Sequence, residues 1–206
     1  MKQIPVVLVL GFALSLCNLS NKLKSSNSNS PGTTTSSSSG PVEKAELSAA
    51  QAQALAGGDT AKWEAQGMSW SVPAKWTQNT DEPLSFGWRS PGGWDAANLI
   101  VSISAMTEGF PAEMSINSYY DAAKGRMKNG EVDEVKWVEI DGLKGVQFRE
   151  ANPPKPDGIR RLQWMAYRKY AGQLQFVNLI LSSSGKGFPT HQDEMYGVLN
   201  SMKIVH

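Results

Sequence analysis

Residues 132–150 read VDEVKWVEIDGLKGVQFRE, and this stretch decides the fold. At its centre, Asp141 and Gly142 are a preferred type I′ pair, because both residue types tolerate positive φ. A two-residue turn there joins two strands, over 132–140 and 143–150. The turn creates favourable cross-strand pairs: Glu139 with Lys144, Trp137 with Val146, and Val135 with Phe148. The sequence therefore predicts a β-hairpin at this point.

A second hairpin follows the first. Strands over Ile159–Tyr170 and Gln173–Ser182 are joined by a turn at Ala171-Gly172. The segment NPPKPDG, residues 152–158, lies between the hairpins and is too rich in proline to join a ladder. Two hairpins in succession favour a largely antiparallel sheet.

Two helices accompany these strands. Over Ser115–Asn129 the apolar residues recur at helical spacing, with Ser115 as a candidate N-cap and Asn129-Gly130 as the end. A second helix is expected over 189–201, with Pro189 in its first turn. The expected strands outside the hairpins are Lys62–Gln66, Met68–Val72, Leu84–Arg89, Asn98–Met106 and a short terminal one over Lys203–Val205. The prediction is an α+β fold, a largely antiparallel sheet with helices packed on it.

The N-terminus has the pattern of an export signal. Lys2 precedes an apolar run, Ile4–Leu16, that spans about 20 Å as a helix, too short for a membrane core of about 30 Å. The sequence Leu14-Ser15-Leu16-Cys17 resembles a lipobox, in which the cysteine becomes the N-terminus and carries lipid such as palmitate. Leu16 departs from the small residue usual there, so an uncleaved or differently cut signal is the alternative.

These features divide the chain into three parts. Residues 1–16 are the predicted signal peptide, 17–58 hold the lipid-attachment Cys17 and a Ser-rich tether, and 59–206 form the globular domain. The tether over 18–42 has too few apolar residues to offset its ordering entropy, so we expect it to be disordered. Residues 43–56 are rich in alanine, and we expect a marginal helix there or none.

Charge and cysteine content exclude several classes of function. The chain carries 20 Lys+Arg and 19 Asp+Glu, and removal of residues 1–16 takes away Lys2 and leaves a net charge of zero. Nucleic-acid binding requires a clear excess of positive charge, so we expect none. Cys17 is the single cysteine, so no disulfide can form within the chain.

Two stretches carry a family resemblance. Residues 67–76, GMSWSVPAKW, and residues 195–203, MYGVLNSMK, resemble the start and end of domains of the PsbP-like superfamily. That superfamily includes a DcrB-like group of bacterial envelope lipoproteins. The resemblance covers about residues 60–206 and implies an α/β/α sandwich around an antiparallel sheet. It implies no shared reaction and transfers no site residue, because members share architecture rather than chemistry.

No catalytic residue, metal site or cofactor is predicted. The domain has no cysteine, and its histidines are His191 and the terminal His206. Adjacent acidic pairs such as Asp133-Glu134 are expected to diverge on the surface. The segment Ser183–Gly187 resembles a phosphate loop but lacks the required spacing, and Phe188 stands where the hydroxyl should be.

Three residues are candidate partner contacts. Trp94 lies in the Gly-rich segment Ser90–Asp95, where it is either a loop staple folded on the sheet or an anchor for a partner or ligand. Arg161 and Lys169 share strand parity in a basic hairpin with Arg160 and Arg168. This basic face either meets an anionic partner or is simply solvated.

The function that these observations favour is not enzymatic. We expect a binding or assembly-support module of the bacterial cell envelope, held to the membrane by lipid, with its domain in the periplasm or outside the cell and an unidentified envelope protein as partner. The alternative is a ligand-binding or hydrolytic envelope domain with a Trp-lined pocket. A concave site lined by Trp, with converging polar groups, would favour that alternative.

Overall fold

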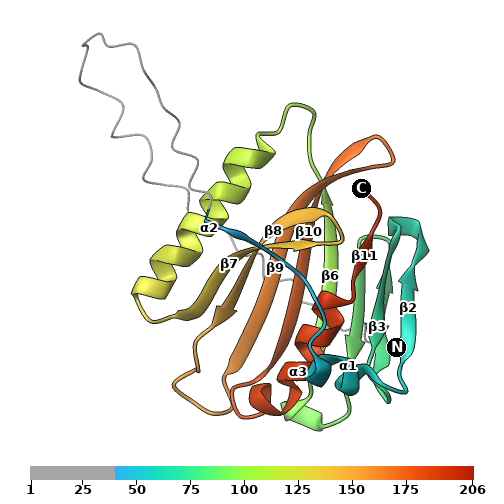
Figure 1. Ribbon diagram of the computed structural model, residues 1–206, viewed down its shortest axis with the longest axis vertical. Helices are drawn as coiled ribbons and strands as arrows, with labels where there is room; N and C mark the ends of the chain where they lie inside the picture. The colour runs from blue at the N-terminus through green and yellow to red at the C-terminus, as the bar shows by residue number, and fades with distance from the viewer. Residues whose placement is uncertain (1–39) are drawn as a thin grey trace, which may run out of the picture. The chain divides into compact units, whose positions relative to one another are not determined.

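A computed structural model describes residues 40–206, which contain two sheets (Figure 1). One sheet has three strands, in the order β11 (Lys203–Ile204), β3 (Met68–Val72) and β2 (Asp59–Trp63). The other has eight. Their order is β1 (Val42–Lys44), β7 (Val132–Ile140), β8 (Leu143–Glu150), β9 (Ile159–Tyr170), β10 (Gln173–Ser184), β6 (Asn98–Ala105), β5 (Ser85–Arg89) and β4 (Thr77–Glu82).

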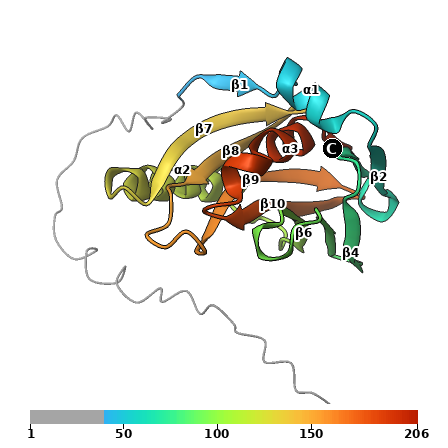
Figure 2. The ribbon, with the colours of Figure 1, turned by 90° about the horizontal axis from the view of Figure 1, so that it is seen from below.

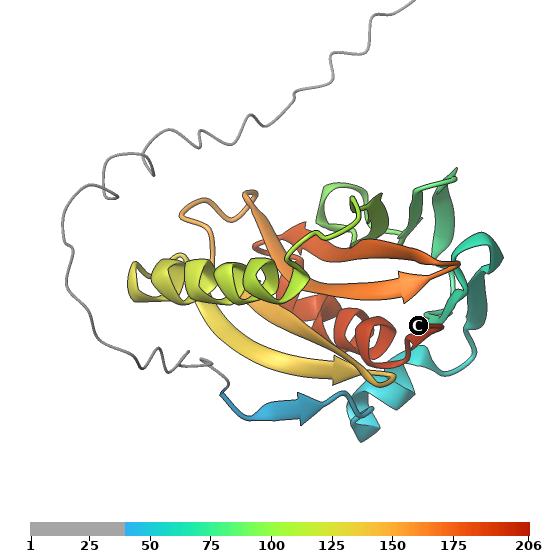
Figure 3. The ribbon, with the colours of Figure 1, turned by 90° about the horizontal axis from the view of Figure 1, so that it is seen from above.

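Helices cover both faces of the large sheet (Figures 2 and 3). On one face α2 (Ala112–Lys128) packs on β7, β8 and β9, and on the other face α3 (Phe188–Asn200) packs beside the small sheet. The first pair in the large sheet, β1 with β7, is parallel, and the other pairs are antiparallel. The α+β prediction, with helices packed on a largely antiparallel sheet, is confirmed.

The main core fills the space between the large sheet, α3 and the small sheet. Alternate residues of each strand point into it, as period-2 burial requires, for example Val177, Leu179 and Leu181 of β10. Tryptophans make up much of its volume. Four of the seven belong to it, Trp63, Trp70, Trp76 and Trp164, and Trp88 packs against it. Trp137 is also buried, but on the α2 face of the sheet.

Trp164 of β9 lies across the neighbouring strand β8. Its indole N–H donates to the carbonyl of Val138 on β7, at 3.2 Å, and its side chain is fully buried. The indole passes over Gly145, where a Cβ would lie 2.6 Å from Trp164 Nε1 and 2.5 Å from the carbonyl oxygen of Met165. Glycine is therefore required at position 145, and this contact joins three strands.

Both predicted hairpins form with the expected turns. Asp141 and Gly142 have φ of 50° and 85°, and Ala171 and Gly172 have φ of 50° and 79°, as type I′ turns require. The cross-strand pairs of the first hairpin are those predicted from the sequence. The Asp141 carboxylate also accepts from the Ile204 N–H at 2.8 Å and from Lys203 Nζ at 3.1 Å, which fastens the C-terminal strand to the turn.

The structure decides between the two alternatives for residues 43–56. These residues form β1 and a helix, α1 (Ala49–Leu55), which begins with a capping box between Ser48 and Gln51. The helix docks on α3 at Gly197, where a Cβ would lie 3.1 Å from Leu55. Tertiary contact, rather than local propensity, stabilises this short helix. The predicted signal peptide, Cys17 and the tether as far as residue 39 lie outside the described residues.

Three other boundaries differ from the predictions. Strand β4 was not among the expected strands, because its sequence TQNTDE is polar; it is an exposed edge strand. The strand expected over Lys62–Gln66 is β2, which ends at Trp63, and residues 64–66 form a 3₁₀ turn instead of continuing it. Helix α2 begins at Ala112 rather than after Ser115, whose hydroxyl hydrogen-bonds the Tyr167 hydroxyl at 2.8 Å instead of capping the helix.

We predict that Gly145→Ala lowers the free energy of unfolding by about 2–4 kcal/mol, because the new methyl group would displace Trp164 and break its bond to Val138. Urea denaturation measures the loss. Gly125→Ala is the control, since a Cβ there in α2 meets nothing within 4 Å and should raise stability by up to about 1 kcal/mol. Equal stabilities of the two variants would contradict the role of Gly145.

We also predict a pH-dependent contribution from Asp141. Partial burial raises the pKa of this carboxyl, but the Ile204 N–H and the Lys203 ammonium outweigh that effect and lower the pKa below its ordinary value. Its stabilisation is therefore present above about pH 4 and is lost as the pH falls through the lowered pKa. Asp141→Asn, which tolerates the same φ, should cost up to about 1 kcal/mol at pH 7 and progressively less as the pH falls toward 2.

Denaturation of wild type and variant at both pH values measures this contribution. Asp121→Asn, on the exposed face of α2, is the matched control and should have no effect at either pH. A constant Asp141→Asn deficit across the pH range would show that the carboxylate charge plays no part.

Candidate functional site

Trp94 differs from the other tryptophans in being exposed. Its side chain is 68% exposed, on a 3₁₀ turn, Gly93–Asp95, between β5 and β6. The indole N–H donates to the carbonyl of Asp157 at 3.0 Å, and no part of the ring enters the core cluster. Of the alternatives left open by the sequence, the structure excludes a staple buried against the sheet.

The turn that carries Trp94 is held firmly at its base. Asp95 accepts hydrogen bonds from Ser184 Oγ to its carboxylate, at 2.5 Å, and from Ser183 Oγ to its carbonyl, at 2.7 Å. On the other side Arg89 donates to the Gly93 carbonyl. The segment Ser183–Gly187, which superficially resembles a phosphate loop, therefore serves to fasten the Trp94 turn. An exposed indole on a fixed backbone loses little entropy when it binds.

Arg161 and Lys169 do not form a common patch. They share a face of β9, as their parity predicts, but eight residues of strand separate them by about 26 Å. Arg161 pairs with Glu150 at 3.2 Å, whereas Lys169 is exposed near the far end of the strand. The other two members of the basic hairpin face inward: Arg160 bonds to Asp133 and Arg168 to Gln175.

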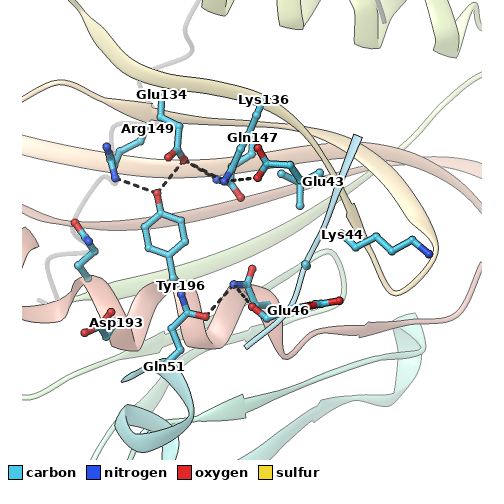
Figure 4. A pocket seen from close by; sticks show the side chains of 14 residues that line it. Glu43, Lys44, Glu46, Gln51, Glu134, Lys136, Gln147, Arg149, Asp193 and Tyr196 are labelled. Carbon is cyan, nitrogen blue, oxygen red and sulfur yellow. Dashed lines mark hydrogen bonds and ion pairs between the residues drawn. The ribbon is translucent and has the colours of Figure 1, made fainter. Parts of the chain in front are cut away.

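A polar pocket lies where β1 and α1 meet α3 (Figure 4). Its volume is about 310 Å³, and the sheet contributes its floor from β7 and β8. The side chains around it are mostly charged or amide groups: Glu43, Lys44, Glu46, Gln51, Glu134, Lys136, Gln147, Arg149, Gln192, Asp193, Tyr196 and Asn200. Sequence analysis did not identify this pocket.

Glu134 is the centre of the hydrogen-bond network in the polar pocket (Figure 4). Its carboxylate accepts from Gln147 Nε2 at 2.8 Å and from the Tyr196 hydroxyl at 3.0 Å, and it lies 3.9 Å from Lys136 Nζ. Lys136 in turn pairs with Glu43 of β1 at 2.9 Å. The network thus joins the sheet to α3 and to the first strand.

Tyr196 is held as a hydrogen-bond donor. Burial raises the pKa of its hydroxyl far above the ordinary value, and the Glu134 carboxylate raises this pKa further, while Arg149 lowers it. Arg149 donates to the same hydroxyl at 3.2 Å. A phenol that keeps its proton cannot serve as a base, and the Tyr196 hydroxyl instead donates its hydrogen bond to Glu134.

A bulge in β7 explains why the acidic pair Asp133-Glu134 was misjudged. The pairing with β8 shifts register between Val132 and Glu134, so the two adjacent carboxylates meet partners on the same side of the sheet. Asp133 pairs with Arg149 at 2.7 Å and with Arg160 at 2.6 Å. Strand parity alone could have identified Glu134 and Lys136, because both share the parity of the core residues Val138 and Ile140 and so lie on the same face of the sheet.

An aromatic pocket lies on the opposite face, beneath the start of α2. It encloses about 340 Å³ and is lined by Trp137 and Tyr167 together with Glu113, Asn117 and Lys144. The Lys144 ammonium lies 4.4 Å from the centre of the Trp137 ring, and Tyr120 stacks on that ring. This is a concave site lined by Trp with polar groups around it, the kind of site that favours ligand binding.

The histidines have local partners in the structure. His191 Nδ1 lies 2.6 Å from Glu194 of the same helix, and His206 Nδ1 lies 2.9 Å from the Ile204 carbonyl. In residues 40–206, no three His, Cys, Asp or Glu side chains gather closely enough to hold a metal ion. No helix in these residues is both long and apolar enough to span a membrane.

Comparison of whole folds finds related structures, although no protein-family model and no curated protein matches the sequence. LpqN of Mycobacterium tuberculosis, described as involved in cell envelope biogenesis, is 14% identical with a TM-score of 0.52 over 73% of this chain and 86% of its own. The domain shares the fold of LpqN.

Two further structures have a more distant likeness. The cyanobacterial PsbP protein of Synechocystis sp. PCC 6803 is 13% identical, with a TM-score of 0.48 over 71% of this chain and 92% of its own. The Ran-binding protein Mog1p of Saccharomyces cerevisiae is 7% identical, with a TM-score of 0.43 over 72% and 95%. At these identities, likeness concerns architecture alone.

Proposed function

We propose that this chain is a non-enzymatic binding or assembly-support module of the bacterial cell envelope, anchored to the membrane through lipid on Cys17. The observation that carries the proposal is the Trp94 turn. An aromatic side chain that is 68% exposed, on a turn held by Asp95, has the features of an interface anchor. Tryptophan is among the residues most enriched at binding hot spots.

The polar pocket supports a structural rather than a catalytic role for its charged groups. Glu134, Lys136 and Arg149 are each paired within the domain, and Tyr196 retains its proton. General acid–base work instead needs a group whose pKa lies near the working pH. These residues bind β1 and α3 to the sheet.

The envelope location rests on the N-terminal sequence and is consistent with the fold. Cys17 ends a short apolar segment in the pattern of a lipobox. LpqN, which shares the fold, is described as acting in cell envelope biogenesis. The proposed partner is an envelope protein that meets the domain at Trp94.

A second candidate function is ligand binding in the aromatic pocket. Tyr167 and the buried Trp137 line this pocket, and Glu113 and Lys144 offer opposite charges, around about 340 Å³. Such a composition suits a small amphipathic molecule. Changes at Trp94 would then leave ligand binding intact, whereas Lys144→Ala would weaken it.

We predict that Cys17→Ser moves the protein from the membrane fraction to the soluble fraction, because the thiol is the proposed point of lipid attachment. Fractionation of cells and intact-mass analysis of the purified protein measure this. The wild type should carry an acyl mass on a chain that begins at Cys17. A wild-type mass without lipid would show that the lipoprotein proposal is wrong.

We predict that Trp94→Ala leaves the free energy of unfolding within about 1 kcal/mol of wild type, since most of the ring is already in water. The same change should weaken partner binding by about 2 kcal/mol or more. A photo-reactive residue at position 94, in the full-length protein in its native membranes, should link to a single envelope protein.

Position 114 is the matched control for this experiment. Met114 on α2 is 69% exposed, as much as Trp94, but lies on another face. Identical cross-linking patterns at positions 94 and 114 would contradict an interface at Trp94. A large loss of stability in Trp94→Ala would also remove this residue from the interface.

A further inference from the structure

Trp94 lies at one end of the large sheet, where several loops meet. Strand register brings these loops together. Strand β5 ends at Arg89, opposite the first residues of β6 and β4, and β10 ends at Ser184, opposite the first residue of β9. We call the surface formed by residues 73–76, 89–95, 152–159 and 185–187 the Trp94 end.

Four cationic side chains lie on the Trp94 end, one from each of its four segments. All are exposed: Lys75, Arg89, Lys155 and Lys186. The Lys186 ammonium is 3.9 Å from the Asp95 carboxylate, and the other three cations have no carboxylate partner within residues 40–206. Arg89 donates instead to the carbonyl of Gly93, which holds its guanidinium beside the Trp94 turn.

Carboxylates are fewer on the Trp94 end. Asp95 accepts a hydrogen bond from Ser184 at the base of the turn, and Asp157 is the one carboxylate there without a partner in the part of the chain that the structure describes. The excess of positive charge is local, because removal of residues 1–39, with three lysines and no acidic residue, leaves 17 Lys+Arg against 19 Asp+Glu. A negative domain therefore carries a positive Trp94 end.

Two apolar side chains lie among these cations. Trp94 is mostly exposed, and Ile159, two residues beyond Asp157, is 41% exposed. The indole N–H is already bonded to the Asp157 carbonyl, so Trp94 offers a partner its ring surface rather than a donor. An apolar centre within a charged rim is the usual composition of a protein interface.

Lys75 is held in a conformation that lysine rarely adopts. The Trp76 N–H bonds to the Pro73 carbonyl at 3.3 Å and closes a turn in which Lys75 is the third residue, with φ of 69°. Glycine is favoured at this position when φ is positive. Backbone strain of this kind is found at binding sites, and here it is kept at one of the cations of the Trp94 end.

We propose that the Trp94 end binds an acidic segment of a protein partner, whose carboxylates meet the four cations while an apolar side chain meets Trp94. The acidic partner rests on the proposed interface at Trp94 and specifies its chemistry. Neighbouring strands are about 4.8 Å apart, so the loops from β4 to β9 extend over about 19 Å. An extended segment of about six residues has this length.

An anionic bilayer is the other surface that tryptophan and lysine contact together, and two observations favour a protein. Asp157 places a free carboxylate beside Trp94, where the negative surface of such a bilayer would repel it. The net negative charge of residues 40–206 would oppose the approach of the whole domain. A protein segment can instead place its carboxylates opposite the lysines and leave Asp157 uncovered.

Charge reversal tests the acidic partner. A photo-reactive residue at position 159, in the full-length protein in its native membranes, leaves Trp94 in place and reports on contact with the partner. Lys155→Glu combined with Lys186→Glu should lower the yield of the cross-linked product about tenfold, because two attractive contacts become repulsive. Raising the ionic strength from about 0.1 M to about 1 M, which shortens the Debye length from about 10 Å to about 3 Å, should also lower the yield.

The matched control is Lys62→Glu combined with Lys169→Glu. This variant makes the same change in net charge at two exposed lysines outside the Trp94 end, and it should leave the yield unchanged. Equal effects of the two pairs would overturn the acidic partner. Mass spectrometry of the cross-linked peptide should find several Asp or Glu residues near the linked position, and a peptide without them would overturn it as well.

Lys75→Gly is an independent test, because it should act in opposite directions on folding and on binding. Glycine adopts φ of 69° without strain, so the urea midpoint should rise, while loss of the cation should lower the cross-linking yield about twofold. A folding defect would lower both quantities. A yield at the wild-type level would contradict the proposal.

Trp94→Ala, with the same probe at position 159, separates the acidic partner from the interface itself. If this variant abolishes the product while lysine reversal and salt have no effect, the Trp94 interface stands and the acidic partner is wrong. If it leaves the product unchanged, both are wrong. Binding of the purified Cys17→Ser protein to vesicles of equal phosphatidylglycerol and phosphatidylcholine, lost in Trp94→Ala, would also overturn a protein partner.

Discussion

The contact of Trp164 with Gly145 is the constraint on which the rest of the structure depends. A fully buried indole crosses β8 at a residue without a side chain and bonds to the backbone of β7. This fixes the relative position of both hairpins, since β7 and β8 belong to one and β9 to the other. The apolar core then forms against α3 and the small sheet, and the polar pocket forms farther along the same strands.

The sequence predicted structure that depends on neighbouring residues and missed structure that depends on residues far apart in the chain. Both hairpins were predictable, because their turns are set by Asp141-Gly142 and Ala171-Gly172 and their register by the turns. The pairing of β1 with β7 was not predictable, because it is parallel and joins residues more than ninety positions apart. The stability of helix α1 was not predictable for the same reason, because it comes from the contact of Leu55 with Gly197.

The candidate sites show a similar division. Trp94 could be singled out because an aromatic residue beside two glycines is conspicuous in a sequence, although its exposure required the structure. The polar pocket could not be found by looking for catalytic motifs, since its charges are distributed over several elements. Its residues on β7 do share the parity of the core residues of that strand, but the bulge at Asp133 cannot be inferred from parity. Arg161 and Lys169 share parity and therefore a face of β9, but eight residues of strand separate them. Shared parity alone therefore does not place two residues in one patch.

The attachment of β1 and α1 has a consequence for local unfolding. This segment is the route by which the chain enters the domain from its N-terminal side. It is held by a three-residue strand, by the pair Glu43–Lys136 and by a helix with no fully buried residue. A weakly held element of this kind unfolds locally at a lower free-energy cost than the core strands. We therefore expect its amides to exchange with solvent before those of β8 and β9. A pull on the N-terminal end of this segment would therefore detach β1 and α1 first and hydrate Glu134 and Lys136, while the core stayed folded.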